Sequence, residues 1–323
     1  MKISELFFSL IIPVYNRPQE IDELLESVIN LNFNYDFEVL IIEDGSTLKC
    51  DKIVEKYKDL LSIHYFFKEN SGAGKSRNFG MQQALGNYFI ILDSDVLLPE
   101  NYLREVKNAL EINFTDAFGG PDAAHSNFTD IQKAINYSMT SVLTTGGIRG
   151  KKKAVGKFQP RSFNFGLSQT AFTITNGFSN LKYGEDIDLT FRLWKNGLET
   201  QLIEKAFVYH KRRTSIKQFF KQTYNFGTAR PKLNQKYPET AKITYWFPSL
   251  FILGLFGSIF LLIFGYAQLL CFFALYILLI FLDSLGKNKN LKVALLSILT
   301  SITQFLGYGL GFLRSYFSKE NTL

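Results

Sequence analysis

Two carboxylates separated by a single residue follow a short apolar segment. Residues 88–92 are Tyr-Phe-Ile-Ile-Leu, and Asp93, Ser94 and Asp95 come directly after them. The apolar segment predicts a buried strand, whose end would place both carboxylates at the edge of a sheet. A buried strand also holds its backbone rigid, which would fix their positions. Mg²⁺ and Mn²⁺ accept oxygen ligands of this kind and neutralise the phosphates of a nucleotide-activated substrate. Two acids after a strand are also often a plain turn, so the interpretation depends on the surrounding elements.

Two further acidic motifs could take part in chemistry. Asp44 follows the apolar residues 37–42 and precedes a Gly-Ser turn, where its carboxylate could accept a hydrogen bond from a uracil or guanine base. An Asx-turn or a helix cap explains the same residue. Glu185 and Asp186 begin a predicted helix over 184–194, where Asp186 could act as a general base. Compensation of the helix dipole is the competing explanation.

Basic and imidazole side chains add possible partners for these acids. Gly72 and Gly74 lead into a predicted helix that carries Arg77, but the spacing of the glycines is not that of a P-loop. The start of this helix, with Arg77, could still face a phosphate. His210 ends a predicted strand over 206–209 and is either a metal ligand or a partly buried histidine.

The elements that must position these residues alternate regularly. Near-continuous apolar runs predict buried strands, and amphipathic segments between them predict helices. This alternation predicts an α/β fold with a parallel sheet covered on both faces. Ligands bind at the carboxyl ends of such strands, so the loops after Val14, Ile42 and Leu92 should share one site. The predicted strands are 6–14, 37–42, 63–67 and 88–92; the predicted helices begin at Arg17-Pro18 and cover 52–61 and 73–85.

Two later segments allow two interpretations each. Residues 144–156 are rich in Gly and Lys and form a predicted mobile loop, which could close over a charged substrate or simply be solvated. Residues 215–226 interleave aromatic side chains with Lys217 and Lys221. This segment is either an amphipathic helix in a membrane interface or a core helix.

Charge and hydropathy indicate a membrane. Residues 205–242 contain ten basic residues and one acidic residue, and residues 243–282 contain no charge. Forty residues of helix would reach about 60 Å, twice the thickness of a bilayer core, so two spans are predicted there. A third uncharged run, 293–313, is long enough to cross by itself. The basic residues adjoin these runs, which favours a membrane surface over nucleic acid as the partner.

Orientation follows from the same basic residues. The segment 205–242, together with Lys287, Lys289 and Lys292, should lie on the cytoplasmic side. The N-terminus shows no signal-peptide pattern, and two cysteines cannot form a disulfide framework. We therefore expect a cytoplasmic catalytic domain at a bacterial inner (plasma) membrane.

Taken together, the motifs resemble those of the family-2 glycosyltransferases, which are inverting enzymes of the GT-A fold. The matches occur in the order of the family's motifs and cover roughly residues 7–214. They are Ile11-Ile12-Pro13-Val14-Tyr15-Asn16, Glu43-Asp44-Gly45-Ser46, Asn70 with Gly72, Lys75-Ser76-Arg77-Asn78-Phe79-Gly80, Leu92-Asp93-Ser94-Asp95 and Gly184-Glu185-Asp186.

The resemblance implies a role for each motif residue. It implies a GT-A (nucleotide-diphospho-sugar transferase) doubly wound mixed sheet, followed by C-terminal transmembrane helices. A divalent cation, Mg²⁺ or Mn²⁺, would be held by Asp95 with help from His210. Asp186 would be the catalytic base, and Glu185 would orient the acceptor. The nucleotide-sugar would be bound by Pro13, Tyr15, Asp44, Arg77, Asp93 and Ser94.

Two departures from the family pattern refine the functional hypothesis. The chain has Asn176-Gly177-Phe178-Ser179 where the family often has Gly-Gly-Phe-Asp, so we expect an acceptor-side contact to differ. It also lacks the Gln-x-x-Arg-Trp motif of processive synthases. We therefore expect transfer of one sugar from a nucleotide-diphospho-sugar to a lipid-linked glycan acceptor, in cell-surface polysaccharide synthesis. The alternatives are a polyprenyl-phosphate sugar synthase and a non-catalytic, nucleotide-sugar-binding membrane scaffold.

The predicted domain organisation has three parts. Residues 1–214 form a GT-A catalytic domain, and residues 215–242 form a basic amphipathic interface segment. Residues 243–323 form a membrane domain with about three transmembrane helices, in contact with membrane lipids. We do not expect the chain to bind nucleic acid.

Overall fold

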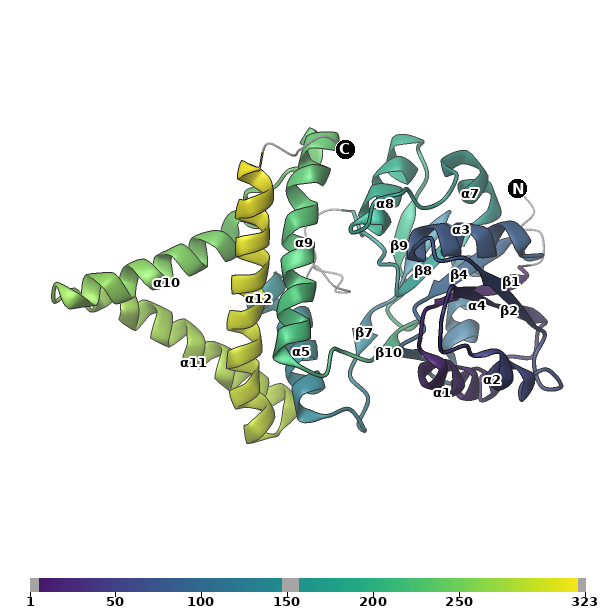
Figure 1. Cartoon of the computed structure of the whole chain (residues 1–323), viewed down its shortest axis with the longest axis horizontal. Coiled ribbons are helices and arrows are strands. Elements are labelled where there is room, and N and C mark those ends of the chain that lie inside the picture. The colour runs from purple at the N-terminus through teal and green to yellow at the C-terminus, as the bar shows by residue number, and fades with distance from the viewer. Residues whose placement is uncertain (1–5, 147–156, 319–323) are drawn as a thin grey trace. The chain divides into compact units, whose positions relative to one another are not determined.

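The computed structural model describes residues 6–146 and 157–318 of the chain (Figure 1). The chain forms two compact units. The first comprises Met1–His125 and Arg149–Lys211, and the second comprises Ser126–Ile148 and Arg212–Leu323. The three domain ranges predicted from the sequence stay a prediction. Most of the predicted mobile loop 144–156 lies outside the described residues.

The first unit is built on a seven-stranded sheet with the order β3-β2-β1-β4-β8-β6-β9. Its first four strands are parallel and match the four predicted apolar runs: β1 Phe8–Val14, β2 Phe37–Asp44, β3 Ile63–Lys68 and β4 Tyr88–Leu92. The helices between them are α1 Pro18–Ile29, α2 Asp51–Glu55 and α3 Ala73–Gln83. The predicted α/β fold is confirmed.

The second half of this sheet is not purely parallel. Strand β8 (Asn164–Ser168) runs antiparallel to both β4 and β6 (Ala117–Gly119), and β9 (Thr200–Leu202) is parallel to β6. The sheet is therefore mixed, as the family resemblance implied. A smaller three-stranded sheet has the order β5-β10-β7, with β5 Val96–Leu97, β10 Val208–His210 and β7 Asp122–Ala123.

Helices cover both faces of the large sheet, because its strands point alternate side chains to opposite sides. Leu10 and Ile12 of β1 belong to one core cluster, with helices α1 and α4 (Tyr102–Ile112). Ile11 belongs to the other cluster, with α3, α7 (Gln169–Thr175) and α8 (Glu185–Lys195). Strands buried on both faces hold their carboxyl ends in fixed positions, which is where the site residues follow.

One predicted helix is too long. The sequence predicted a helix over 52–61, but α2 ends at Glu55. After it, the backbone N–H groups of Lys56, Tyr57 and Leu60 bond to carbonyls three residues earlier, so this stretch consists of tight turns. The hydroxyl of Tyr57 donates to the Asp22 carboxylate at 2.7 Å, which anchors these turns to α1.

The second unit is helical. It contains α5 (Asp130–Thr140), α6 (Val142–Thr145) and the long helix α9 (Ile216–Lys236), followed by short 3₁₀ turns at Pro238–Thr240 and Ile243–Trp246. Three apolar helices follow: α10 Phe247–Ile263, α11 Gln268–Asn288 and α12 Leu291–Phe317. All three, with the 3₁₀ turn counted into the first, are long and apolar enough to span a membrane. This agrees with the predicted C-terminal transmembrane helices.

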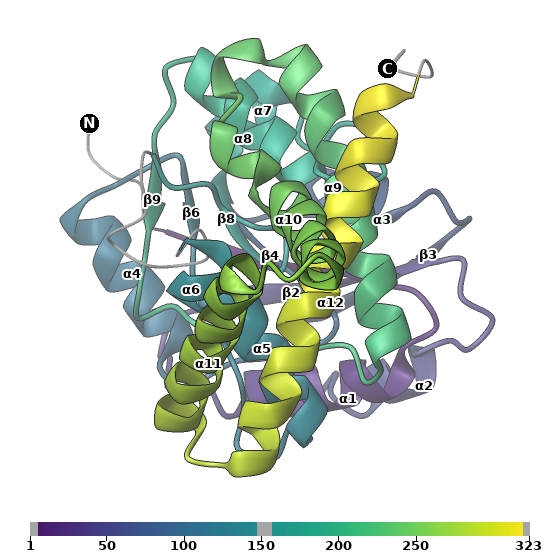
Figure 2. The ribbon, with the colours of Figure 1, turned by 90° about the vertical axis from the view of Figure 1, so that its left-hand side faces the viewer.

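Within this unit, α10 and α11 form a hairpin that extends from α12 (Figures 1 and 2). Phe251 of α10, Phe273 of α11 and Phe305 of α12 pack in one cluster, which joins the hairpin to α12. Helix α9 lies beside α12. The sequence did not indicate that residues 126–148, which lie between strands of the first unit, would belong to this helical unit.

Candidate functional site

The two carboxylates after β4 lie next to His210. Strand β10 pairs antiparallel with β5 and places His210 opposite Val96, one residue beyond Asp95. His210 Nε2 is 3.2 Å from Asp95 Oδ1, and its ring stacks on Phe163. Asp93, Asp95 and His210 each offer one ligand atom, and these atoms all lie within 4.8 Å of one another. The sequence suggested Asp95 and His210 as metal ligands, and the structure places Asp93 in the same group of possible ligands.

This donor set fits a divalent cation. Two carboxylates and one imidazole suit Mn²⁺ well, while an imidazole ligand is less usual for Mg²⁺. The Oδ1 atom of Asp95 is buried and faces His210 Nε2 at 3.2 Å, and no other described residue donates a hydrogen bond to it, so a lone pair is available to a metal. The cation would sit among three side chains that the fold already holds together.

A basic side chain not expected from the sequence also contacts Asp95. Arg17 Nη1 donates to Asp95 Oδ2 at 2.6 Å. Burial by itself would raise the pKa of Asp95, but the neighbouring charges and hydrogen bonds of His210 and Arg17 outweigh it and lower the pKa well below its ordinary value. Asp95 is therefore ionised at neutral pH. From the sequence, Arg17 was assigned only to the start of a helix. Its position directly after β1, at the sheet edge where the other site residues lie, is the sequence feature that could have identified it as a site residue.

Asp44 ends β2 and holds the loop before α3. Its Oδ1 accepts from the N–H of Ser71 and its Oδ2 from the N–H of Gly72, both at 2.9 Å, and Lys68 forms an ion pair with it. A Cβ on Gly45 would lie 2.6 Å from the backbone nitrogen of Asn70, so only glycine permits this approach. Burial would raise the pKa of Asp44, but Lys68 and the N–H of Ser71 lower it. In this structure Asp44 therefore binds backbone N–H groups ahead of a helix, as the Asx-turn or helix-cap explanation predicted.

Arg77 joins the metal motif to the base motif. Its Nη2 donates to Asp93 Oδ1 and its Nη1 to Glu185 Oε1, both at 2.8 Å. The guanidinium is 4% exposed and lies 5.1 Å from the centre of the Phe178 ring. The sequence suggested a phosphate partner for Arg77, but in this structure both Nη groups contact carboxylates. Its buried Nε has no hydrogen-bond partner among the described residues.

Glu185 and Asp186 begin α8, after Gly184 in a left-handed conformation (φ 81°). Burial raises the pKa of Glu185, and the positive charge of Arg77 opposes this shift more strongly than the negative charge of Asp186 adds to it. Asp186 accepts from the N–H of Ile187 at 2.8 Å and from the N–H of Ser162 at 3.2 Å. These contacts orient the Asp186 carboxylate, which is half-buried.

The remaining predicted residues lie at the same strand ends. Pro13 is in β1, Tyr15 just beyond it is 52% exposed, and Ser94 is buried between Asp93 and Asp95. Asn16, which was not singled out for any role, has a positive φ of 53°. Its Oδ1 accepts from the N–H groups of Thr47 and Leu48, which ties the loop after β1 to the loop after β2.

The structure thus brings together the loops after β1, β2 and β4, as the strand pattern predicted. Arg17 links the first loop to Asp95, and Arg77 links Asp93 to the start of α8. The result is a cluster of carboxylates balanced by two buried or half-buried arginines. Such a cluster can hold a cation, orient a proton acceptor and present exposed Tyr15 to a planar group.

Comparisons with known proteins agree with this geometry. The family model "Glycosyl transferase family 2" matches residues 9–174, just over half of the chain. Chondroitin synthase of Escherichia coli is 26% identical over 236 residues, covering 63% of this chain and 34% of that protein. The poly(ribitol-phosphate) β-N-acetylglucosaminyltransferase TarS of Staphylococcus aureus is 34% identical over 112 residues, covering 34% of this chain and 20% of that protein. The chain therefore spans about a third or less of the length of these relatives.

Solved structures show the same fold. The mannosyltransferase PcManGT of Pyrobaculum calidifontis, in complex with GDP-Man and Mn²⁺, has a TM-score of 0.62 at 15% identity and covers 98% of this chain and 89% of that chain. TarS residues 1–349 in complex with UDP-GlcNAc has a TM-score of 0.50 at 22% identity, covering 69% and 66%. These likenesses place the first unit in the GT-A fold.

Proposed function

Because the chain belongs to glycosyl transferase family 2, we propose that it transfers one sugar from a nucleotide-diphospho-sugar to an acceptor hydroxyl. The observation that carries this proposal is the Arg77 bridge. It connects the Asp93–Asp95–His210 cluster, which suits a metal-bound diphosphate, with Glu185 and Asp186, which suit an acceptor. Donor and acceptor chemistry would then meet at one buried guanidinium.

In the proposed reaction, Asp186 accepts the proton of the attacking hydroxyl. The new bond forms between that oxygen and the anomeric carbon, while the bond from the anomeric carbon to the diphosphate oxygen breaks. A divalent cation at Asp93, Asp95 and His210 would stabilise the negative charge of the leaving diphosphate. Asp186 is suited to its role because two backbone N–H groups orient its carboxylate. Glu185 would position the acceptor.

A single in-line attack inverts the anomeric configuration, and we propose this outcome. A retaining mechanism through a covalent intermediate would need a carboxylate nucleophile on the opposite side of the sugar, and the motif residues supply a base instead. With an α-linked donor, the product should be β-linked. The coupling constant of the anomeric proton in the product distinguishes the two outcomes.

The acceptor is proposed to be lipid-linked. Three helices long and apolar enough to span a membrane follow the first unit in the sequence. Relatives of the chain include chondroitin synthase of Escherichia coli and the minor teichoic acid biosynthesis protein GgaB of Bacillus subtilis. An acceptor held in a bilayer would be presented to an enzyme held at the same bilayer. The basic segment 205–242 favours the cytoplasmic side of a bacterial inner membrane, where nucleotide-sugars are made.

Donor turnover by the purified chain in lipid tests these proposals. With a panel of nucleotide-sugars and Mn²⁺, Asp186→Asn should lower turnover by about 10²- to 10⁴-fold, the usual effect of losing a general base, with donor binding retained. Glu111→Gln, at an exposed ion pair with Lys107, is the matched control and should keep wild-type turnover. Equal turnover in wild type and Asp186→Asn would disprove the role of Asp186.

The same assay separates the alternatives. A wild-type chain that binds a nucleotide-sugar but turns over no donor with any lipid-linked acceptor would be a scaffold. Glycosylation of simple polyprenyl phosphate would instead indicate a polyprenyl-phosphate sugar synthase. Turnover that survives chelation of divalent cations would remove the metal from the proposal.

A further inference from the structure

Helix α12 is long and apolar enough to cross a bilayer, yet one of its sides is covered along almost its whole length. A Cβ on Gly307 would lie 2.2 Å from Thr223 Oγ1, and one on Gly311 would lie 2.1 Å from the carbonyl oxygen of Tyr224. Ser315 Oγ donates to the carbonyl of Thr228 at 2.9 Å. Helix α9 is therefore pressed against the C-terminal half of α12.

Helix α5 covers the other half of the same side. Thr300 Oγ1 donates to the carbonyl of Ala134 at 3.1 Å, and Lys292 forms an ion pair with Asp130 at 2.9 Å. Contacts with α5 or α9 thus recur along α12 from Lys292 to Ser315. Any depth that α12 reaches in a bilayer, α5 and α9 must reach with it.

Neither covering helix suits a hydrocarbon environment. Helix α9 contains five basic residues and no acidic residue: Lys217, Lys221, Arg230, Lys232 and Lys236. Lys217, Lys221 and Lys236 are exposed, and α5 carries Asp130 and Lys133. Charged side chains within a bilayer core are strongly disfavoured unless they reach water or a counter-charge. Helix α9 cannot accompany α12 across a membrane at an acceptable cost.

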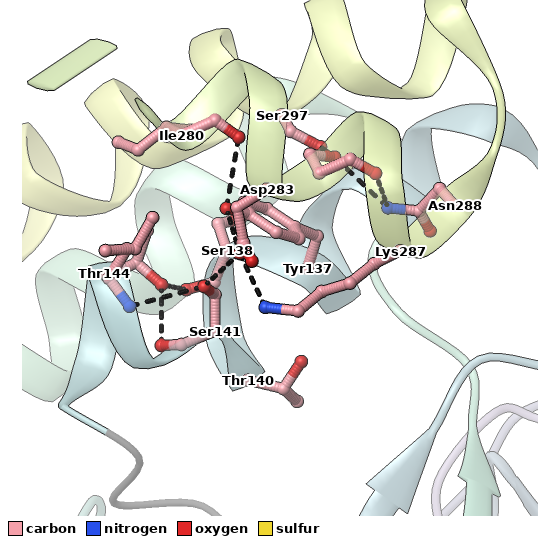
Figure 3. A network of polar contacts seen from close by, with 12 residues as sticks. Tyr137, Ser138, Thr140, Ser141, Thr144, Ile280, Asp283, Lys287, Asn288 and Ser297 are labelled. Atoms are coloured by element: carbon pink, nitrogen blue, oxygen red, sulfur yellow. Dashed lines mark hydrogen bonds and ion pairs between the residues drawn. The ribbon is translucent and has the colours of Figure 1, made fainter. Parts of the chain in front are cut away.

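The polar end of α11 indicates the level at which α5 lies. Figure 3 shows Asp283 of α11 accepting hydrogen bonds from Tyr137 at 2.7 Å, from Ser141 at 3.0 Å and from Lys287 at 2.5 Å. Tyr137 also donates to the carbonyl of Ile280 at 3.1 Å. This network joins α5 and its following turn to the charged last turns of α11, which belong at a membrane surface rather than within it.

The uncovered side of α12 is apolar. Leu295, Leu299 and Leu310 are 54%, 48% and 44% exposed, and Ile302, Leu306 and Leu313 continue the same stripe at spacings of three or four residues. Lys292 and Arg314 lie at its two ends. An apolar stripe with basic residues at its ends, backed by a polar side, is typical of a helix that lies in a membrane interface.

We propose that α10 and α11 enter the bilayer as a hairpin, whereas α12 lies along the membrane surface with this leucine stripe buried among the lipid acyl chains. Leu306 of the stripe packs against the cluster of Phe251, Phe273 and Phe305 that joins the hairpin to α12, so stripe and hairpin form a continuous apolar surface. In this arrangement α9 stays on the water side of α12. The residues that precede α10 and those that follow α12 then lie on the same side of the membrane.

Tryptophan depth measurements test this arrangement. Leu295→Trp, Ile302→Trp and Leu310→Trp are made one at a time in a Trp194→Phe, Trp246→Phe background, and the chain is reconstituted with lipids brominated at different depths. A surface helix predicts the same shallow quenching profile at all three positions. A spanning helix predicts deep quenching at 302 and shallow quenching at 295 and 310. Phe256→Trp, on the exposed face near the middle of α10, is the deep reference.

Sidedness gives an independent readout that needs no tryptophan substitution. In a Cys271→Ser background, Ser318→Cys and the reference Lys58→Cys in the first unit are labelled with a membrane-impermeant maleimide in sealed vesicles. We expect both to react from the same side. Reaction of Ser318→Cys from the opposite side, or a deep profile at 302 alone, would overturn the proposal. Neither measurement depends on enzymatic activity.

Discussion

Removing the guanidinium of Arg77 tests whether one buried cation holds the two acidic motifs together. Arg77 is 4% exposed, and the side chains of its partners Asp93 and Glu185 are 30% and 14% exposed. Arg77→Met keeps much of the apolar volume but removes both 2.8 Å hydrogen bonds. Glu185 would then be a largely buried carboxylate next to Asp186 without a cation.

The size of the effect follows from this burial. Breaking a buried ion pair by removing one partner costs about 3–5 kcal/mol. Asp93 can be rehydrated because nearly a third of it is exposed, so the lower end, about 3 kcal/mol, applies. At about 2–4 °C per kcal/mol for a unit of roughly this size, Arg77→Met should lower Tm by about 6–12 °C. Arg77→Lys should lose about half as much, since one ammonium cannot serve both carboxylates.

Thermal unfolding of the purified chain in detergent, without donor, measures this effect. Lys58→Met, which removes an exposed ion pair with Glu55, is the control and should cost less than about 0.5 kcal/mol. Adding Asp93→Asn and Glu185→Gln to Arg77→Met should recover part of the loss, because neutral amides need no cation. A Tm of Arg77→Met equal to that of wild type would refute the reasoning.

Three further changes have defined outcomes. The pKa of Asp44 is lowered in the folded chain, so its ionised carboxylate stabilises the fold above about pH 4. This stabilisation disappears as the pH falls through the lowered pKa. The urea midpoints of wild type and Asp44→Asn should therefore differ at neutral pH and converge in acid. Tyr137→Phe removes hydrogen bonds to Asp283 and to the Ile280 carbonyl, so the helical unit should lose about 1–3 kcal/mol in detergent melts, and an unchanged melt would show that the network is not stabilising. Gly311→Val places side-chain atoms where the Tyr224 carbonyl lies and should cost about 1–3 kcal/mol or more by overpacking, whereas the exposed neighbour change Leu310→Val should leave the melt unchanged.

The sequence predicted those parts of the fold that local patterns specify. The four strands β1 to β4 are continuous apolar runs buried on both faces, so length and composition identify them without knowledge of their partners. Their parallel order then placed the loops after Val14, Ile42 and Leu92 at one edge. Each acidic motif was identified by its position directly after a strand or at a helix start.

Long-range pairing is what local patterns do not specify. Strands β6, β9 and β10 have only three residues each, too few for a recognisable period, and β8 runs antiparallel between β4 and β6. Arg17 showed no motif of its own, and its contact with Asp95 depends on where β1 ends relative to β4. The membership of residues 126–148 in the helical unit depends on contacts such as Tyr137 with Asp283, which are 146 residues apart.

The α12 example shows why hydropathy and packing must be considered together. By length and composition all three C-terminal helices could span a membrane, because composition counts residues around the whole helix. In the apolar 18-residue stretch of α12, half of the residues are buried within the chain. The corresponding shares are 22% for the first of these helices and 17% for the second. Buried glycines, serines and threonines of α12 meet polar helices, so its apolar character is available to lipid on one side only. A helix with one lipid-facing side satisfies the hydrophobic effect by lying in the interface, and that position also leaves the lysines of α9 in water.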